Sequence, residues 1–154
     1  YIYIYVLGLQ HIRRFTEPME SYPQSVAELA RLLDIPVEDL LIPCNFCGNF
    51  LSFLELHEFD AKILTLIWKD HLVFACCRCC CTASGFFEFQ HFYEQSVIGR
   101  DIETVEQKTI FEVIVRCHQC LRLLDQIDKL DICGRRQHFH KVRGGWRGRC
   151  RFCK

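Results

Sequence analysis

Paired Cys-x-x-Cys loops, repeated with one internal spacing, constrain this chain more than any other sequence feature. The two sets are Cys44, Cys47, Cys77 and Cys80, and then Cys117, Cys120, Cys150 and Cys153. In each set 29 residues separate the two loops, and each position of the second set lies 73 residues after its counterpart. Such an internal repeat indicates one architecture used twice.

The chemistry of these loops favours a metal. A Cys-x-x-Cys loop can direct two sulfurs at one ion about 2.3 Å away, and two loops close a tetrahedral all-sulfur site that suits Zn²⁺. Four protein ligands leave no open position for water, so each ion is expected to be structural rather than catalytic. Chance spacing would have to occur twice. The sequence therefore predicts two structural zinc ions.

Twelve cysteines would also suit a disulfide-rich secreted protein, so the compartment matters. No secretory signal is visible, because the apolar stretch Tyr1–Leu9 lacks a preceding basic segment and is too short to span a bilayer. We therefore expect thiolate ligands and no membrane span. Met19 is the only methionine, and residues 1–18 are interpreted as a non-native upstream extension without assigned function.

The second loop of the first set has two readings, because Cys76, Cys77, Cys79, Cys80 and Cys81 run together. Either Cys76/Cys79 or Cys77/Cys80 has the required spacing, and the repeat selects the second pair. The remaining cysteines are then expected to be packing or surface residues: Cys76, Cys79, Cys81 and Cys133.

Other cysteine chemistries fit less well. Redox Cys-x-x-Cys motifs do not come as spaced quartets, and a cross-braced ubiquitin ligase would need interleaved ligands, usually with a histidine. His118 is read as a surface residue, since its four-sulfur set is already complete. His138 and His140 share one strand face and are read as solvated positions.

Local patterns predict short helices and strands around the loops. Ser25-Val-Ala-Glu28 is typical of a capping box that opens a helix through Leu33. A helical turn is expected at Val37–Leu41, and a longer helix at Phe86–Gln95. The expected strands are Leu64–Trp68, His71–Ala75, Thr109–Val115, His138–Val142 and Trp146–Arg149.

Together these features predict an α+β fold of two small pseudo-duplicated four-cysteine zinc domains, each a short sheet with short helices, joined by a linker helix. The expected division is an N-terminal helical arm at 19–43, the first zinc domain at 44–85, a linker helix region at 86–105 and the second zinc domain at 106–154.

The charge distribution offers a second functional hypothesis. The formal net charge is zero, but no acidic residue follows Asp131 while eight Lys and Arg residues do. An arginine-rich zinc surface is compatible with a zinc-dependent, DNA-binding transcription regulator that contacts phosphates weakly. Neutralising Arg147, Arg149 and Arg151 would test that hypothesis.

With both quartets in place, the chain resembles the early protein six family of papillomaviruses. The resemblance rests on Ile42-Pro-Cys-Asn-Phe-Cys47, the doubled 29-residue spacing, the 36 residues between the sets, and Phe139-His-Lys-Val-Arg-Gly-Gly-Trp146-x-Gly-x-Cys150. It runs from about Met19 to Lys154, and the cysteine run at 76–81 is similar to the cutaneous beta group.

The resemblance implies a non-enzymatic viral adaptor and oncoprotein that captures acidic Leu-x-x-Leu-Leu helices of host proteins in a cleft between two zinc domains. It implies effects on Notch coactivators, ubiquitin-ligase targeting, host apoptosis and innate immunity, in the host nucleus and cytoplasm. Carried over by position, the peptide-binding residues would be Phe46, Leu64, Ile67, Lys69, Cys76, Cys81, Phe87, Ile114, Arg116 and Arg143.

The favoured partner by resemblance is a Mastermind-like coactivator, with a HECT-type ubiquitin ligase as a second candidate. Gly145 stands where several mucosal members carry an arginine, which weakens the expectation for the ligase. The chain stops one residue after Cys153, so no PDZ-binding tail is expected. Weak homodimerisation is a further expectation. Leu64→Asp should abolish helix capture and spare phosphate binding.

Overall fold

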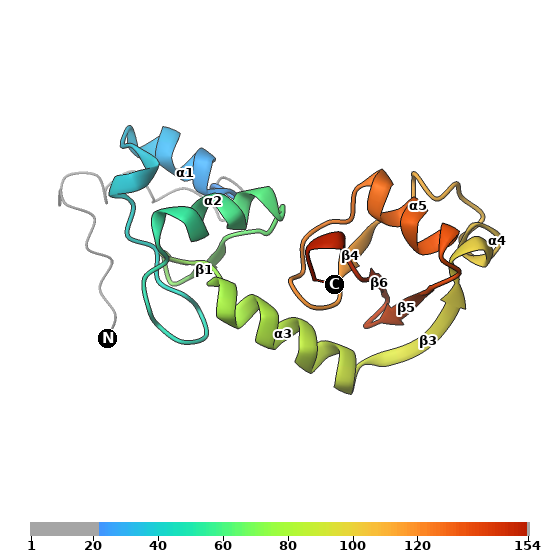
Figure 1. The fold of residues 1–154 in the computed structure, drawn as a ribbon. Coiled ribbons are helices and arrows are strands. Elements are labelled where there is room, and N and C mark those ends of the chain that lie inside the picture. The colour runs from blue at the N-terminus through green and yellow to red at the C-terminus, as the bar shows by residue number, and fades with distance from the viewer. Residues whose placement is uncertain (1–21, 154) are drawn as a thin grey trace. The chain divides into compact units, whose positions relative to one another are not determined.

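A computed structural model describes residues 22–153 of the chain and divides it into two compact units, with the boundary between Cys80 and Cys81 (Figure 1). The segment 1–18, together with the first residues of the expected N-terminal arm, lies outside the described residues. Within the described part, no helix is both long and apolar enough to cross a membrane.

Two capped helices build one side of the first unit. Helix α1 (Val26–Leu33) begins at Ser25, whose side chain accepts from the Glu28 backbone N–H, as the sequence predicts. The Glu28 carboxylate instead accepts from Gln24 N–H at 2.9 Å. A turn of 3-10 helix, η3 (Val37–Asp39), follows at the predicted position, and α2 (Phe53–Ala61) begins with a full capping box.

Asp60, in the last turn of α2, joins the two helices. Its carboxylate oxygens accept the backbone N–H groups of Val26 and Ala27, each at 2.8 Å. These N–H groups have no partner inside α1, so a carboxylate there satisfies them and complements the positive end of the helix. The apolar faces of α1 and α2 share one buried core, which includes Val26, Leu29, Leu33, Leu56 and Phe59.

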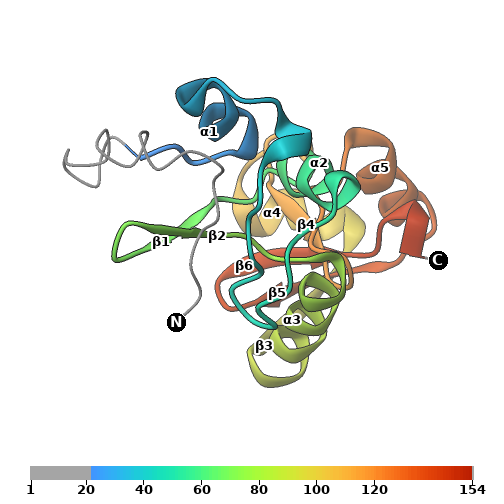
Figure 2. The ribbon, with the colours of Figure 1, turned by 90° about the vertical axis from the view of Figure 1, so that its left-hand side faces the viewer.

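The first unit also contains a narrow hairpin of strands β1 (Ile67–Lys69) and β2 (Leu72–Phe74), visible in Figure 2. The predicted hairpin is confirmed, but its strands are shorter and its turn lies one residue later, at Asp70 and His71. Both turn residues have positive φ, 48° and 64°, which matches the twist of a two-residue hairpin loop.

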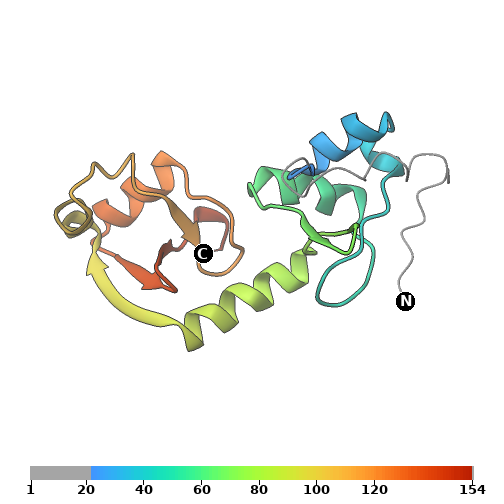
Figure 3. The same ribbon diagram turned by 180° about the vertical axis from the view of Figure 1, so that it is seen from behind.

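A long helix crosses the division between the units. Helix α3 (Arg78–His91) begins inside the cysteine run and ends four residues before the predicted limit at Gln95. The aromatic spacing that predicted Phe86–Gln95 does belong to this helix, but strand β3 (Tyr93–Ile98) follows almost immediately (Figure 3). Tyr93, Val97 and Ile98 favour strand, which explains the early end.

The second unit is a four-stranded sheet covered by short helices. Its strand order is β3-β5-β6-β4, with β5 (His138–Val142), β6 (Gly145–Gly148) and β4 (Val115–Cys117). The predicted hairpin is confirmed, whereas Thr109–Val115 is wrong as a strand: residues 109–114 form turns, and β4 begins only at Val115. The helical elements are η4 (Gly99–Asp101), α4 (Ile102–Glu106), α5 (Gln126–Gly134) and η5 (Arg151–Cys153).

The repeat extends well beyond the cysteines. Helices α2 and α5 are offset by 73 residues at both ends, and each begins with a capping box. The hairpin turn at Asp70 and His71 has its counterpart 73 residues later at Arg143 and Gly144, again with positive φ at both positions. The predicted pseudo-duplication is therefore a property of the backbone and not only of the ligands.

Candidate metal centres

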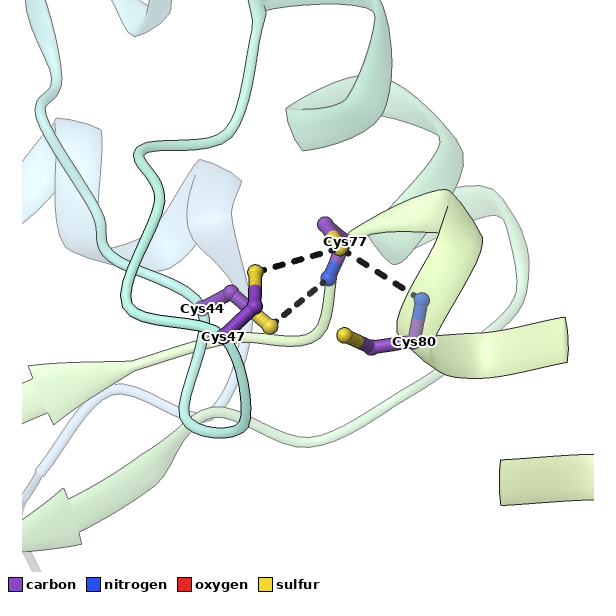
Figure 4. A group of neighbouring side chains, drawn as sticks. All are labelled: Cys44, Cys47, Cys77 and Cys80. Carbon is purple, nitrogen blue, oxygen red and sulfur yellow. Dashed lines mark hydrogen bonds between the residues drawn. The ribbon is translucent and has the colours of Figure 1, made fainter. Parts of the chain in front are cut away.

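The first four-cysteine cluster is built from a tight loop and a helix start. The loop 44–47 is closed by hydrogen bonds from Cys44 N–H to Asn49 O at 2.7 Å and from Gly48 N–H to Cys44 O at 3.0 Å. Gly48 has φ of 77°, a conformation that favours glycine. Cys77 and Cys80 flank the first residues of α3, so their side chains come from a rigid element (Figure 4).

All four thiols of this cluster point inward (Figure 4), and their sulfurs lie within 4.8 Å of one another. The Sγ atoms of Cys47 and Cys77 are 3.8 Å apart. Ligands placed about 2.3 Å from a central ion at the corners of a tetrahedron are separated by about 3.8 Å. The spacing therefore fits a zinc ion.

The second cluster repeats this geometry with Cys117, Cys120, Cys150 and Cys153. Cys120 Sγ and Cys150 Sγ are again 3.8 Å apart. Leu121, the counterpart of Gly48, donates its N–H to Cys117 O at 3.0 Å and has φ of 63°. A non-glycine residue rarely takes this conformation, so the tertiary structure around the loop 117–121 must impose it.

The electrostatics of both clusters call for a cation. Burial raises the pKa of the Cys44 thiol, but backbone N–H groups of Cys47, Cys77 and Phe46 outweigh it and lower the pKa to about 6. The thiol of Cys120 lowers the pKa of Cys117 to about 3, whereas the pKa of Cys120 itself is raised. One thiolate per cluster is thus favoured and further ionisation is opposed, until a divalent ion compensates the charge.

The structure brings together both predicted quartets, including the Cys77/Cys80 register. The other cysteines lie elsewhere: Cys79 is exposed, Cys76 packs partly against the first core, and Cys81 is buried. Cys133 donates its S–H to Gly99 O at 3.3 Å. These positions agree with packing and surface roles.

Of the histidines near the second cluster, His118 and His140 are less solvated than the sequence suggested, and His138 is not. His118 and His140 lie 5.1 Å from the Phe89 ring and 6.2 Å from each other, between ring centroids. His140 Nδ1 also hydrogen bonds Ser96 Oγ at 2.7 Å. The reading as solvated positions agrees with exposed His138, whereas His140 is half-buried beside the Phe89 ring.

The residues expected to bind a peptide fall into different environments. Phe46, Phe87 and Ile114 are exposed by 61%, 54% and 74%, as a surface anchor site requires. Leu64 and Cys76 pack partly against the first core, and Ile67 is half-buried. Cys81 is only 1% exposed, so its side chain is a packing residue and we leave it out of the candidate surface.

The three basic residues expected at this surface also differ. Lys69 Nζ donates to Asn45 Oδ1 at 2.7 Å. Half-buried Arg116 donates to Leu121 O at 2.9 Å, and desolvation together with neighbouring Arg147 lowers its pKa. Exposed Arg143 lies 3.7 Å from a Glu88 carboxylate oxygen, with its guanidinium over the Phe92 ring.

A cavity of about 300 Å³ lies in the second unit beside two of these residues, Ile114 and Arg116. Its full lining is Glu106, Lys108, Glu112, Val113, Ile114, Arg116, Gly144, Gly145, Trp146 and Arg147. Trp146 Nε1 donates to Glu106 Oε1 at 2.8 Å, and Glu112 accepts from Thr109, so both acids are already engaged. No sequence pattern predicts the cavity itself, because the cavity depends on the turn at 107–114.

Most basic residues of the C-terminal third are paired. Arg151 bonds Asp125 at 2.7 and 3.0 Å, and Arg122 bonds buried Asp128. Arg147 pairs with Glu88, Lys141 with Glu106 and Arg135 with Asp131. The uneven charge of the sequence is therefore largely neutralised in space.

Two similar four-cysteine zinc modules, each with a capped helix and a hairpin, define a zinc-binding protein of two repeated domains. Residues 44–153 match the family model described as Early Protein (E6), and the chain belongs to that family. The family predicted from the cysteine spacing is confirmed.

Its relatives include Protein E6 of Human papillomavirus 25, 61% identical over 86% of this chain and 82% of the relative. Protein E6 of Human papillomavirus type 8 is 60% identical over 88% and 87%. A solution structure of the C-terminal zinc-binding domain of HPV51 oncoprotein E6 is 32% identical, covering 41% of this chain and 82% of that one, with a TM-score of 0.37.

Proposed function

We propose that this chain is a non-enzymatic adaptor that captures short acidic Leu-x-x-Leu-Leu helices of host proteins. The observation that carries the proposal is Ile114, an isoleucine 74% exposed at the rim of a cavity that two arginines also line. Large exposed apolar side chains beside a cavity mark recognition surfaces.

The chemistry of the rim suits such a helix. Ile114 offers apolar contact for a leucine side chain beside Val113 and Trp146 of the cavity lining, while Arg116 offers charge-assisted hydrogen bonds to an acidic flank. Helix-in-groove recognition uses this combination of apolar anchors and flanking charge. Arg143, exposed on the adjoining turn, would add a further contact.

We also assign peptide contacts, by resemblance to the family, to Phe46, Leu64, Ile67, Lys69 and Cys76 of the first unit and to Phe87 of α3. By family resemblance, the favoured target is a Mastermind-like Notch coactivator, with a HECT-type ubiquitin ligase second. Action on transcription, apoptosis and innate immunity in the host nucleus and cytoplasm would follow from these partners.

Nucleic-acid binding is the weaker hypothesis. Phosphate binding needs basic groups that can displace the counterions of the nucleic acid, but Arg151, Arg147 and Arg122 are each paired with a carboxylate. Recruiting them would break ion pairs that include buried Asp128.

The test is binding of the zinc-loaded chain to two labelled Leu-x-x-Leu-Leu peptides, one from each candidate partner. We expect micromolar or tighter binding to at least one. Ile114→Asp should weaken it by about 100-fold, since an ionised carboxylate would replace an apolar anchor. Ile127→Asp is the matched control, because Ile127 is 67% exposed on α5 and does not line the cavity. Equal effects of the two substitutions would contradict the proposal.

A further inference from the structure

Lys129 is a buried lysine on the inner side of α5. It is 6% exposed, and Asp128 is the only other charged residue that is buried in the described part of the chain. Its Nζ donates to Val113 O at 2.6 Å and to Ile110 O at 3.2 Å. Burying an ammonium group is costly, so these two contacts need a reason.

That reason lies in the segment 107–114, which joins α4 to β4 without pairing to any strand. Glu103 accepts Ile110 N–H at 2.7 Å, and Glu112 accepts Thr109 N–H at 3.0 Å. The carbonyl groups of Ile110 and Val113 would face the interior without a donor if Lys129 were absent. A buried backbone carbonyl needs a donor, and Lys129 supplies it for both.

Val113 and Ile114, the last two residues of this segment, are its apolar residues that line the cavity. Val113 is 4% exposed and Ile114 is 74% exposed, so the backbone between them sets which side chain faces outward. The ammonium of Lys129 donates a hydrogen bond to the carbonyl of Val113, which belongs to the peptide bond between Val113 and Ile114. Movement of this carbonyl would move the exposed isoleucine with it.

We propose that Lys129 is a positioning residue for peptide recognition: it holds the segment 110–114 so that Ile114 stands at the cavity rim. Lys129 does not touch the peptide. The inference rests on the proposed function for its consequence, and on the second unit alone for its mechanism.

Lys129→Met tests the mechanism, because methionine fills similar volume and cannot donate. In the zinc-loaded full chain, we expect amide hydrogen exchange at 110–114 to accelerate about tenfold, with α5 protected and two zinc ions retained. Unchanged exchange at 110–114 would overturn the proposal whatever the peptide does. Arg100→Met, at an exposed basic residue of the same unit that does not line the cavity, controls for loss of charge and should leave exchange unchanged.

Peptide affinity tests the consequence. Lys129→Met should weaken binding of the better peptide about tenfold, and Arg100→Met less than about threefold. In an Ile114→Ala background, Lys129→Met should add little, because both changes act through one side chain. Fully additive losses would mean general destabilisation and overturn positioning. If the native chain bound neither peptide, the proposed function would fail, while the exchange experiment would still decide whether Lys129 holds the segment.

Discussion

The Sγ atoms of Cys47 and Cys77 lie 3.8 Å apart across the first metal centre, although the residues are 30 positions apart in sequence. Cys76, directly before Cys77, has its Sγ 3.7 Å from the Cys77 carbonyl oxygen instead. The Cys77 thiol is therefore a metal ligand and the neighbouring Cys76 thiol a packing group. A one-residue change of register would exchange these two roles.

Zinc stoichiometry should reveal this register directly. Cys77→Ser or Cys80→Ser should reduce bound zinc from two ions per chain to one, because three sulfurs hold a structural ion poorly. Cys76→Ser and Cys79→Ser are the matched controls and should keep two. Metal content of the purified variants decides the matter, and loss of an ion from the Cys76→Ser, Cys79→Ser pair alone would favour the other register.

Much of this centre was predictable from the sequence, and the limits have physical causes. The two-residue spacing of a ligand pair is set by local loop geometry and is visible in the sequence. The 73-residue repeat then selected Cys77 and Cys80 over Cys76 and Cys79. The hairpin that begins with His138–Val142 was equally predictable, because Gly144 readily takes the positive φ that a tight hairpin turn requires. The segment 109–114 was misread as a strand, since its apolar residues are held by Lys129 from a distant helix and not by a ladder. The partial burial of His140 was likewise not predictable, because the Phe89 ring beside it lies 51 positions away in sequence.

The two centres should release zinc in a fixed order. Cys47 is exposed and Cys77 is 8% exposed, whereas Cys117 and Cys150 of the second centre are fully buried. A chelator reaches exposed sulfurs more readily, so we expect release in two steps, the first from the first centre. Release rates from Cys150→Ser, which keeps the first centre, and Cys77→Ser, which keeps the second, identify each step. A faster step from Cys77→Ser would contradict this order.

Stability should rise with pH near neutrality through His140. Burial lowers the pKa of His140 below its usual value of about 6.5, and neighbouring His118 and His138 lower it further. Below about pH 6.5, His140 binds a proton in the unfolded chain but stays neutral in the folded chain until the pH reaches its lowered pKa. The His140 contribution is therefore present above about pH 6.5 and is lost as pH falls toward the lowered pKa.

The measurement is the urea unfolding free energy of the zinc-loaded chain between about pH 5.5 and 7.5. His140→Gln should flatten the pH dependence relative to the native chain. His57→Gln, the same change at an exposed histidine of α2, should leave the dependence as it is. The comparison cancels the pH dependence of zinc binding, which all three chains share. Equal slopes in all three would rule out the role of His140.

Gly85 of α3 packs closely against the loop of the second zinc centre, and its substitution should lower the free energy of unfolding. A Cβ atom at Gly85 would lie 2.8 Å from His118 O and 2.9 Å from Gln119 O, both backbone atoms of the loop that carries Cys117 and Cys120. Neither the loop nor the helix can move without disturbing the metal ligands. We expect Gly85→Ala to destabilise the second unit by about 1–3 kcal/mol.

Gly134→Ala is the matched control, because nothing lies within 4 Å of a Cβ at that helical position. Alanine there should be neutral or stabilising by up to about 1 kcal/mol, since it lowers the entropy of the unfolded chain. Urea unfolding followed by Trp146, which is buried in the second unit, reports the difference. A Gly85→Ala midpoint equal to that of Gly134→Ala would mean that α3 does not pack against the loop of the second zinc centre, and that helix and metal centre are energetically independent.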